Sequence, residues 1–193
     1  MTAMETLLAS SFEKTFSEFA DVDEIKQIKN SLFERYHMTL LSSIKDFKKF
    51  ESITEQVLGG SGTLLIKKTF DQICHLESKL YHIVEIKDES LRNAILLSFE
   101  EPTKKHILDI AFDYPLTLWE IAAKTKMQAK ISENISYLIS WGLLATCDSE
   151  DSEDNKKYYS TIDSFSVNIE DGQFQMYVTI NDILNLEPLK SIS

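Results

Sequence analysis

The side chains best suited to bind a metal ion or to act as nucleophiles are four histidines and two cysteines. Cys74 is followed directly by His75, and His82 comes seven residues later. On one helix, Cys74 and His75 would point about 100° apart, and no further cysteine or carboxylate stands in register with them. We therefore expect neither a metal ion nor another cofactor.

A glycine-rich run at residues 59–62 leads into a predicted helix, whose N-terminus could bind an anion. The run lacks the preceding strand and the Gly-Lys-Ser/Thr ending of a phosphate-binding loop, so a break between two helices is the better interpretation. No serine, cysteine or carboxylate lies in a nucleophile or acid–base motif. We expect that the protein is not an enzyme.

Composition indicates an ordinary globular chain of 193 residues, 43% of them hydrophobic, with 5 glycines and 3 prolines. The apolar residues recur mostly at three- and four-residue spacing, which favours a mainly α fold with a small β part. The sequence has no apolar run long enough for a membrane span, and its first residues lack the basic segment followed by an apolar run that is typical of a signal peptide. We expect a cytoplasmic protein with no membrane partner, and the two cysteines fit a reducing compartment.

Residues 1–84 are predicted to form an all-helical module for dimerisation, sensing or partner docking. Helices are expected at 4–20, from Asp21 to about Tyr36, at 44–58, and from Thr63 to Leu80. Residues 85–101 should contain a linking helix. The first helix has one apolar stripe that exceeds what a short helix needs for its own core, so we expect this stripe to carry self-association. Its members are Leu7, Leu8, Phe12, Phe16 and Phe19.

Residues 102–162 have a different pattern, in which three helices precede two strands. Pro102-Thr103 can begin the first helix with threonine as its cap, and Thr117 can cap the second. The turn 125–127 leads to a third helix that runs from 128 or 129 to Trp141 and ends at Gly142. Strands are expected at 143–147 and 156–162, on either side of the polar run 148–155. A second hairpin should follow, with its turn at Asp171-Gly172.

The segment Glu101-Pro102-Thr103-Lys104-Lys105-His106-Ile107-Leu108 resembles the opening of ArsR-type winged helix-turn-helix transcription regulators. The segments 115–122, 141–144 and 158–162 are similar to the second helix, the end of the third helix and the second wing strand of that family. Archaeal members frequently add a hairpin like the one at 163–180. More loosely, residues 36–41, Phe50 and 59–65 resemble a small helical output domain of ammonia-oxidising archaea. The resemblance implies that residues 102–193 form a winged helix-turn-helix domain with a C-terminal β-hairpin.

In that family the third helix enters the major groove of DNA. Glutamine and lysine can pair with adenine and guanine edges, serine can reach either, and glutamate can accept from cytosine. Lysines in the turn and wing would contact phosphates. The third helix has no arginine for a bidentate contact with guanine. The predicted DNA-binding residues are Lys124, Lys126, Gln128, Lys130, Ser132, Glu133, Ser136, Lys156 and Lys157.

Charge opposes this interpretation, because the formal net charge is -11 and non-specific DNA affinity depends on basic side chains. The run from Asp148 to Asp154 contains five carboxylates. It is either a solvated loop or an acidic loop that inhibits DNA binding or binds a partner. We therefore expect a homodimeric transcription regulator that binds duplex DNA. The alternative is a protein-interaction adaptor on a winged-helix scaffold, for example one that docks on the transcription machinery.

Overall fold

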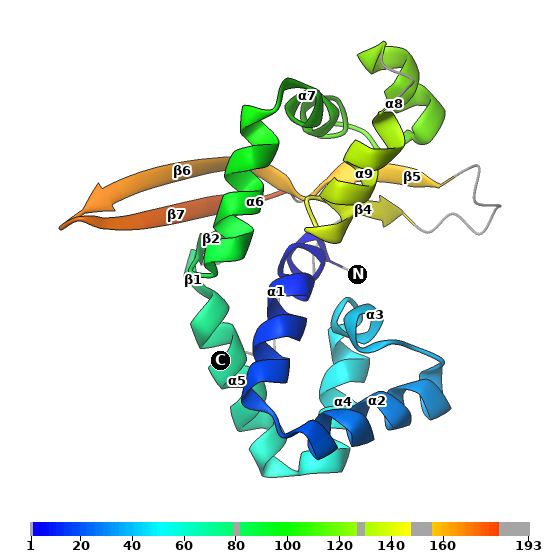
Figure 1. The fold of residues 1–193 in the computed structure, drawn as a ribbon, viewed down its shortest axis with the longest axis vertical. Helices are drawn as coiled ribbons and strands as arrows, with labels where there is room; N and C mark the ends of the chain where they lie inside the picture. The colour runs from blue at the N-terminus through cyan, green and yellow to red at the C-terminus, as the bar shows by residue number, and fades with distance from the viewer. Residues whose placement is uncertain (1, 79–81, 127–129, 148–155, 182–193) are drawn as a thin grey trace.

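The computed structural model describes residues 2–78, 82–126, 130–147 and 156–181. This part of the chain is mainly helical and contains two small antiparallel sheets (Figure 1). The predicted class, mainly α with a small β part, is confirmed. No helix among these residues has both the length and the apolar character needed to cross a membrane.

Five helices form the N-terminal part of the chain. Their bounds are α1 Ala3–Phe19, α2 Val22–Tyr36, α3 Leu40–Ile44, α4 Phe47–Leu58 and α5 Gly60–Ile73. Capping boxes begin α1 and α2, with Thr2 paired to Glu5 and Asp21 paired to Glu24.

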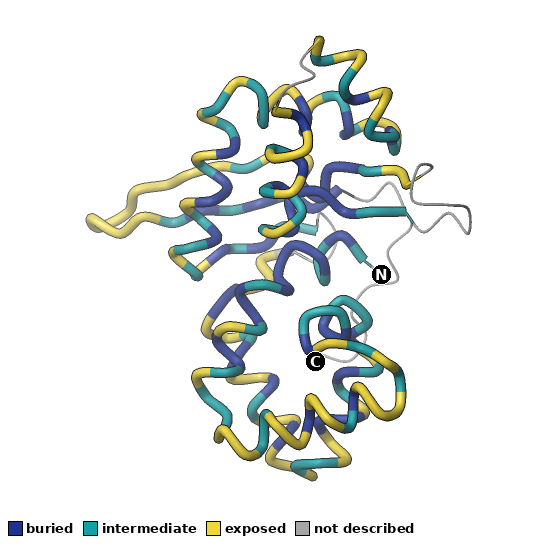
Figure 2. The backbone as a smooth tube through the Cα atoms, turned by 45° about the vertical axis from the view of Figure 1, so that its right-hand side comes forward, coloured by how far each residue is buried: buried dark blue, intermediate teal, exposed yellow. Residues whose placement is uncertain are grey.

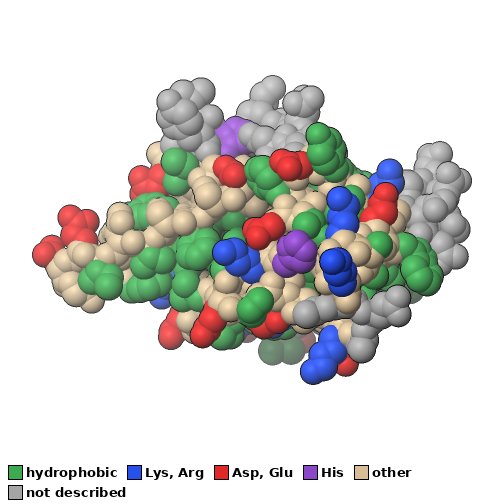
Figure 3. Space-filling model, turned by 90° about the horizontal axis from the view of Figure 1, so that it is seen from above, with side chains coloured by type: hydrophobic (Ala, Val, Ile, Leu, Met, Phe, Trp, Pro, Cys, Tyr) green, Lys and Arg blue, Asp and Glu red, His purple; other side chains and the backbone are tan. Residues whose placement is uncertain are grey.

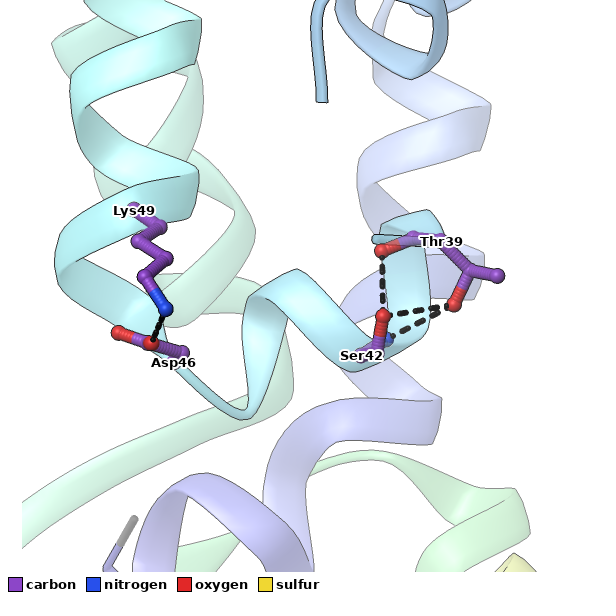
Figure 4. A network of polar contacts seen from close by, with 4 residues as sticks. All are labelled: Thr39, Ser42, Asp46 and Lys49. Carbon is purple, nitrogen blue, oxygen red and sulfur yellow. Dashed lines mark hydrogen bonds and ion pairs between the residues drawn. The ribbon is translucent and has the colours of Figure 1, made fainter. Parts of the chain in front are cut away.

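The helix expected at 44–58 is α4, which begins at Phe47, and a short helix that was not predicted, α3, precedes it (Figure 4). The Thr39 hydroxyl accepts a hydrogen bond of 3.1 Å from the Ser42 backbone N–H at the start of α3. At the start of α4, Lys49 forms a 2.7 Å ion pair with Asp46. The prediction therefore placed the start of α4 too early and missed α3.

The phenylalanines of α1 lie in the centre of the N-terminal helices. Phe12 and Phe16 are fully buried, and the ring centroid of Phe12 lies 5.5 Å from that of Phe50 and 4.7 Å from that of Phe70. Leu7 and Leu8 are buried as well. These four side chains fill the core of their own chain, and the fifth, Phe19, is half-buried with Lys68 Nζ 4.1 Å from its ring centroid, so the stripe leaves little apolar surface for self-association.

Two strands interrupt the region that we expected to be all helical, and that prediction is wrong. Helix α5 ends at Ile73, and β1 (Cys74–Ser78) pairs antiparallel with β2 (Ile83–Ile86). On its other side, strand β2 pairs antiparallel with a strand of the C-terminal hairpin, with Val84 opposite Val178 and Ile86 opposite Met176. Pairing with a strand about ninety residues away overrides the local helical spacing.

The C-terminal hairpin consists of β6 (Ile162–Glu170) and β7 (Gln173–Ile180). Its two-residue turn at Asp171-Gly172 has positive φ at both residues, which confirms the predicted turn. The sheet order is β1-β2-β7-β6. Figure 1 shows the hairpin projecting from the body as an arm, and Figure 2 shows that much of this arm is exposed. Helix α6 (Glu89–Glu100) packs on it through Phe99, whose ring centroid is 4.9 Å from that of Phe165.

The remaining elements form a second compact group. They are α7 Pro102–Ile110, β3 Leu116–Thr117, α8 Leu118–Thr125, α9 Ile131–Ser140, β4 Leu144–Cys147 and β5 Lys157–Ser160. The three strands form a sheet in the order β3-β5-β4. The expected strand 156–162 is split between β5 and β6. Glu101, and not Thr103, caps α7, because its carboxylate accepts hydrogen bonds from the backbone N–H groups of Thr103 and Lys104.

Helix α1 contacts this second group directly. Gly142 follows α9 with φ +69°, and a Cβ at this position would overlap the Thr6 carbonyl oxygen and lie 2.8 Å from Leu7 Cα. The Ser10 hydroxyl donates a hydrogen bond of 2.6 Å to the Ser140 carbonyl. The buried side chains form one continuous core that extends from Ala3 to Ile180.

Candidate nucleic-acid interface

The candidate site is built on α8, α9 and the turn between them. A capping box begins α8: the Thr117 hydroxyl accepts from the Glu120 N–H, and the Glu120 carboxylate accepts from the Thr117 N–H at 2.7 Å. This confirms Thr117 as the cap that the sequence predicts. The helix ends at Thr125 and is followed by Lys126, which has a left-handed backbone with φ 56°. Residues 127–129 lie outside the described part of the chain, and so does the predicted site residue Gln128.

Helix α9 has one buried face and one exposed face. Ile131, Ile135 and Leu138 are buried. Ser132 and Ser136, one helical turn apart, are exposed together with Glu133. The structure therefore leaves these three predicted site residues accessible to a ligand. Lys130 is exposed as well, directly before the helix.

Two of the predicted lysines lie around one carboxylate. The pKa of Glu120 is lowered, first by its hydrogen bonds with Thr117 and then by the positive charges of Lys157 and Lys124. Lys157 reaches this position because it lies opposite Thr117 in the β3–β5 ladder. Lys124 and Lys157 are thus brought together, but Glu120 offsets part of their charge.

Lys156, directly before β5, lies near Lys45 of the N-terminal part of the chain. The pKa of Lys45 is lowered by its burial and by the positive charge of Lys156. Lys45 follows α3 in the sequence, so its proximity to the start of β5 depends on tertiary packing. Sequence reasoning missed Lys45, and no local pattern could have identified it.

Lys104, a further lysine of the predicted unit, packs against α9. Its Nζ lies 4.4 Å from the centroid of the Tyr137 ring, within the range of a cation–π contact. Burial raises the pKa of the Tyr137 hydroxyl, and a hydrogen bond with Ser98 partly opposes that shift. Lys104 therefore also helps to hold α7 against α9.

The surface over α7 and α8 has mixed charge. Viewed from above in Figure 3, lysine side chains, a histidine and acidic side chains are interspersed on this face. From Ile131 to Ser140, helix α9 contains no basic residue and one acidic residue, Glu133. A polyanion would therefore meet scattered lysines rather than a continuous basic surface.

Two large aromatic side chains are unexpectedly exposed beside the site. Trp119 in the first turn of α8 is 75% exposed, and Tyr114 before β3 is 73% exposed. In the sequence, Trp119 lies among apolar residues of its helix, so its spacing alone suggests a buried side chain. In the folded chain Ile121 is the buried residue of α8, and Trp119 points to solvent. The spacing of apolar residues does not show which of them is buried.

The residues first considered for metal binding do not converge. Within the described ranges, no group of three or more His, Cys, Asp or Glu side chains could hold a metal ion. Cys74 and His75 lie on strand β1 and not on a helix, with Cys74 buried and His75 exposed. Burial raises the pKa of the Cys74 thiol to about 12. Comparisons of this chain with protein-family models, curated proteins and solved structures find no match.

Proposed function

We propose that residues 102–162 are a winged helix-turn-helix unit and that the protein is a transcription regulator that binds duplex DNA. In this proposal α8 and α9 are the helix-turn-helix, and α9 enters the major groove. Ser132, Ser136 and Glu133 would face base edges. The lysines before α9 and at the start of β5 would contact phosphates.

The observation that carries the proposal is the exposed polar face of α9 with lysines at its N-terminal end. Lys126 and Lys130 are both exposed on either side of residues 127–129. The three helices α7, α8 and α9 followed by the strands β4 and β5 have the order predicted from the sequence, and this order supports the proposal. A homodimer remains a prediction, without the α1 stripe as its surface.

Fluorescence anisotropy with a labelled duplex of mixed sequence at low salt tests this proposal. We expect saturable binding by the intact chain, weakened by Lys126→Ala and by Lys130→Ala. Each lost phosphate contact should also make the dependence of log K on log salt shallower by about one. Lys67→Ala is the matched control, because Lys67 is an exposed lysine on α5, away from the proposed site.

A second candidate function is a protein-interaction adaptor that uses the same scaffold without DNA. The exposure of Trp119 and Tyr114 favours it, because aromatic side chains are enriched in protein interfaces. The absence of basic side chains from residues 131–140 also favours it. If neither the intact chain nor a chain with a neutralised 148–154 run binds the duplex at low salt, DNA binding is excluded and the adaptor is the remaining candidate.

A further inference from the structure

The outer edge of β6 offers a place where another strand can bind. β6 is the last strand in the order β1-β2-β7-β6, and no described strand pairs with its outer side. It is nine residues long and contains neither proline nor lysine, the residues that commonly protect edge strands from pairing. Its unpaired backbone groups can therefore accept an added strand.

The same strand has apolar side chains that its own helix leaves uncovered. Phe165 lies under Phe99 of α6, but Val167 is 38% exposed and Ile169 is 76% exposed. Phe174, opposite Ile169 on β7, is 40% exposed although Arg92 lies over its ring. An added strand with apolar residues at alternate positions would extend this stripe on one face of the sheet.

A hollow lies between the beginning of β6 and residues of α6 and α7. It has a volume of about 170 Å³, and its apolar part comes from Phe99, Leu108, Phe112 and Ile162. Asp109 and Asp163 also line it, and both are exposed. A long aliphatic side chain with a terminal cation could place its stem against the aromatic rings and its charge near the carboxylates.

All charged residues of the arm have the same sign. Residues 162–180 contain Asp163, Glu170 and Asp171 and no basic residue. Figure 3 shows the acidic side chains at the end of the arm, with hydrophobic side chains along it. Antiparallel pairing of two β6 strands would bring the acidic end of each arm to the acidic start of the other. This repulsion disfavours a second copy and favours a basic partner.

We propose that the β6 edge binds an extended segment of another protein, with apolar residues at alternate positions and lysine or arginine over the hollow. The backbone of β6 would provide the hydrogen bonds, the stripe at Val167 and Ile169 the apolar contact, and Asp109 with Asp163 the charge selectivity. This surface lies on the arm, apart from the exposed face of α9, and it does not depend on DNA binding.

A labelled peptide of about eight residues, a common strand length, tests the proposal. Valine or isoleucine occupies alternate positions of this peptide, lysine occupies the position on the same face that would lie over the hollow, and threonine occupies the other face. We expect saturable anisotropy with the intact chain and much weaker binding of a matched peptide with glutamate in place of lysine. Asp163→Lys and Asp109→Lys should each weaken the lysine peptide by roughly fivefold, as expected for an exposed ion pair. The double variant should prefer the glutamate peptide.

Two further variants locate the bound strand. Ile169→Ser changes an exposed residue of the stripe and should weaken the lysine peptide, and Glu77→Lys makes an equal charge change at the opposite edge, on β1, and should not. No saturable binding, equal binding of both peptides, or an equal effect of Glu77→Lys and Asp163→Lys would overturn the proposal. So would light scattering that shows a dimer which Ile169→Ser converts to a monomer, because a second copy would then occupy the edge.

Discussion

The two faces of α9 differ in nearly every property that determines what a surface can bind. The rear face is apolar and buried: Ile131, Ile135 and Leu138 are buried, and Gly142 after the helix lies close to the backbone of α1. The front face is exposed, and its side chains are serines and a glutamate. Packing therefore fixes where α9 lies, while its front face is free to meet a ligand.

This difference indicates how the N-terminal helices could influence the candidate site. They contact α9 at its C-terminal end, through Ser10 and Ser140, and not on its front face. A change in α1 should therefore alter stability and the placement of α9 without removing a group that touches the ligand. The predictions below test the two faces separately.

The largest effect is expected from Phe12→Ala, which removes the ring at the centre of the aromatic cluster. Large-to-small changes of a buried phenylalanine lower the free energy of unfolding by about 3–5 kcal/mol, and Phe12 is fully buried. Urea denaturation measures the loss. Phe33→Ala is the control, because Phe33 is 63% exposed and its removal should cost little. Similar losses in the two variants would contradict the central position of α1.

A somewhat smaller loss is expected from Gly142→Ala, which acts where α1 meets the end of α9. The added Cβ would overlap the Thr6 carbonyl, and alanine is disfavoured at φ +69°. Overpacking and the left-handed backbone together should lower the free energy of unfolding by about 2–4 kcal/mol. Gly172→Ala has a similar φ of +76° but open space around the glycine, so it separates the backbone effect from the contact. Equal losses at both positions would argue against a tight contact with α1.

Neutralising the carboxylates of residues 148–154 should change duplex binding at the front face and leave the rear face unaffected. The residues from Asp148 to Asp154 lie outside the described part of the chain, but their sequence contains five carboxylates between β4 and β5. Changing these residues to asparagine or glutamine should tighten duplex binding a few-fold at low salt. The gain should shrink with salt, because the Debye length falls from about 10 Å at 0.1 M to about 3 Å at 1 M. A salt-independent gain would indicate a contact other than charge repulsion.

The smallest effect is expected from oxidation. Burial raises the pKa of the Cys74 thiol to about 12, so almost no thiolate exists at neutral pH. Peroxide should leave duplex binding unchanged, and Cys74 should react with a thiol reagent only after the protein unfolds. A loss of binding that reducing agent restores would show a redox response that this environment does not predict.

Local signals predicted several elements correctly. Correct predictions include the cap at Thr117, the turn at Asp171-Gly172 and the polar face of α9. Each of these features depends on residues close together in the sequence. The stripe on α1 was also visible in the sequence. Its spacing identifies an apolar face, but not whether the same chain or another one covers it.

The features that were missed depend on distant parts of the chain. Strands β1 and β2 form because β7 pairs with β2, so the helical spacing before Leu80 misled the prediction. The proximity of Lys45 to Lys156 likewise requires the folded arrangement. Glu101 replaces Thr103 as a cap because a carboxylate one residue before Pro102 can reach two backbone N–H groups. These outcomes follow from tertiary contacts and cap geometry that spacing alone does not specify.

The most direct test of the front face as a DNA-binding surface is an amide NMR titration of the intact protein with a mixed-sequence duplex of about two helical turns at low salt. We predict that the amide resonances of Lys130, Ser132 and Ser136 shift, while those of Thr6 and Gly142 at the rear stay in place. Shifts restricted to the rear face or to the β6–β7 arm, or no shifts at any residue, would contradict the account.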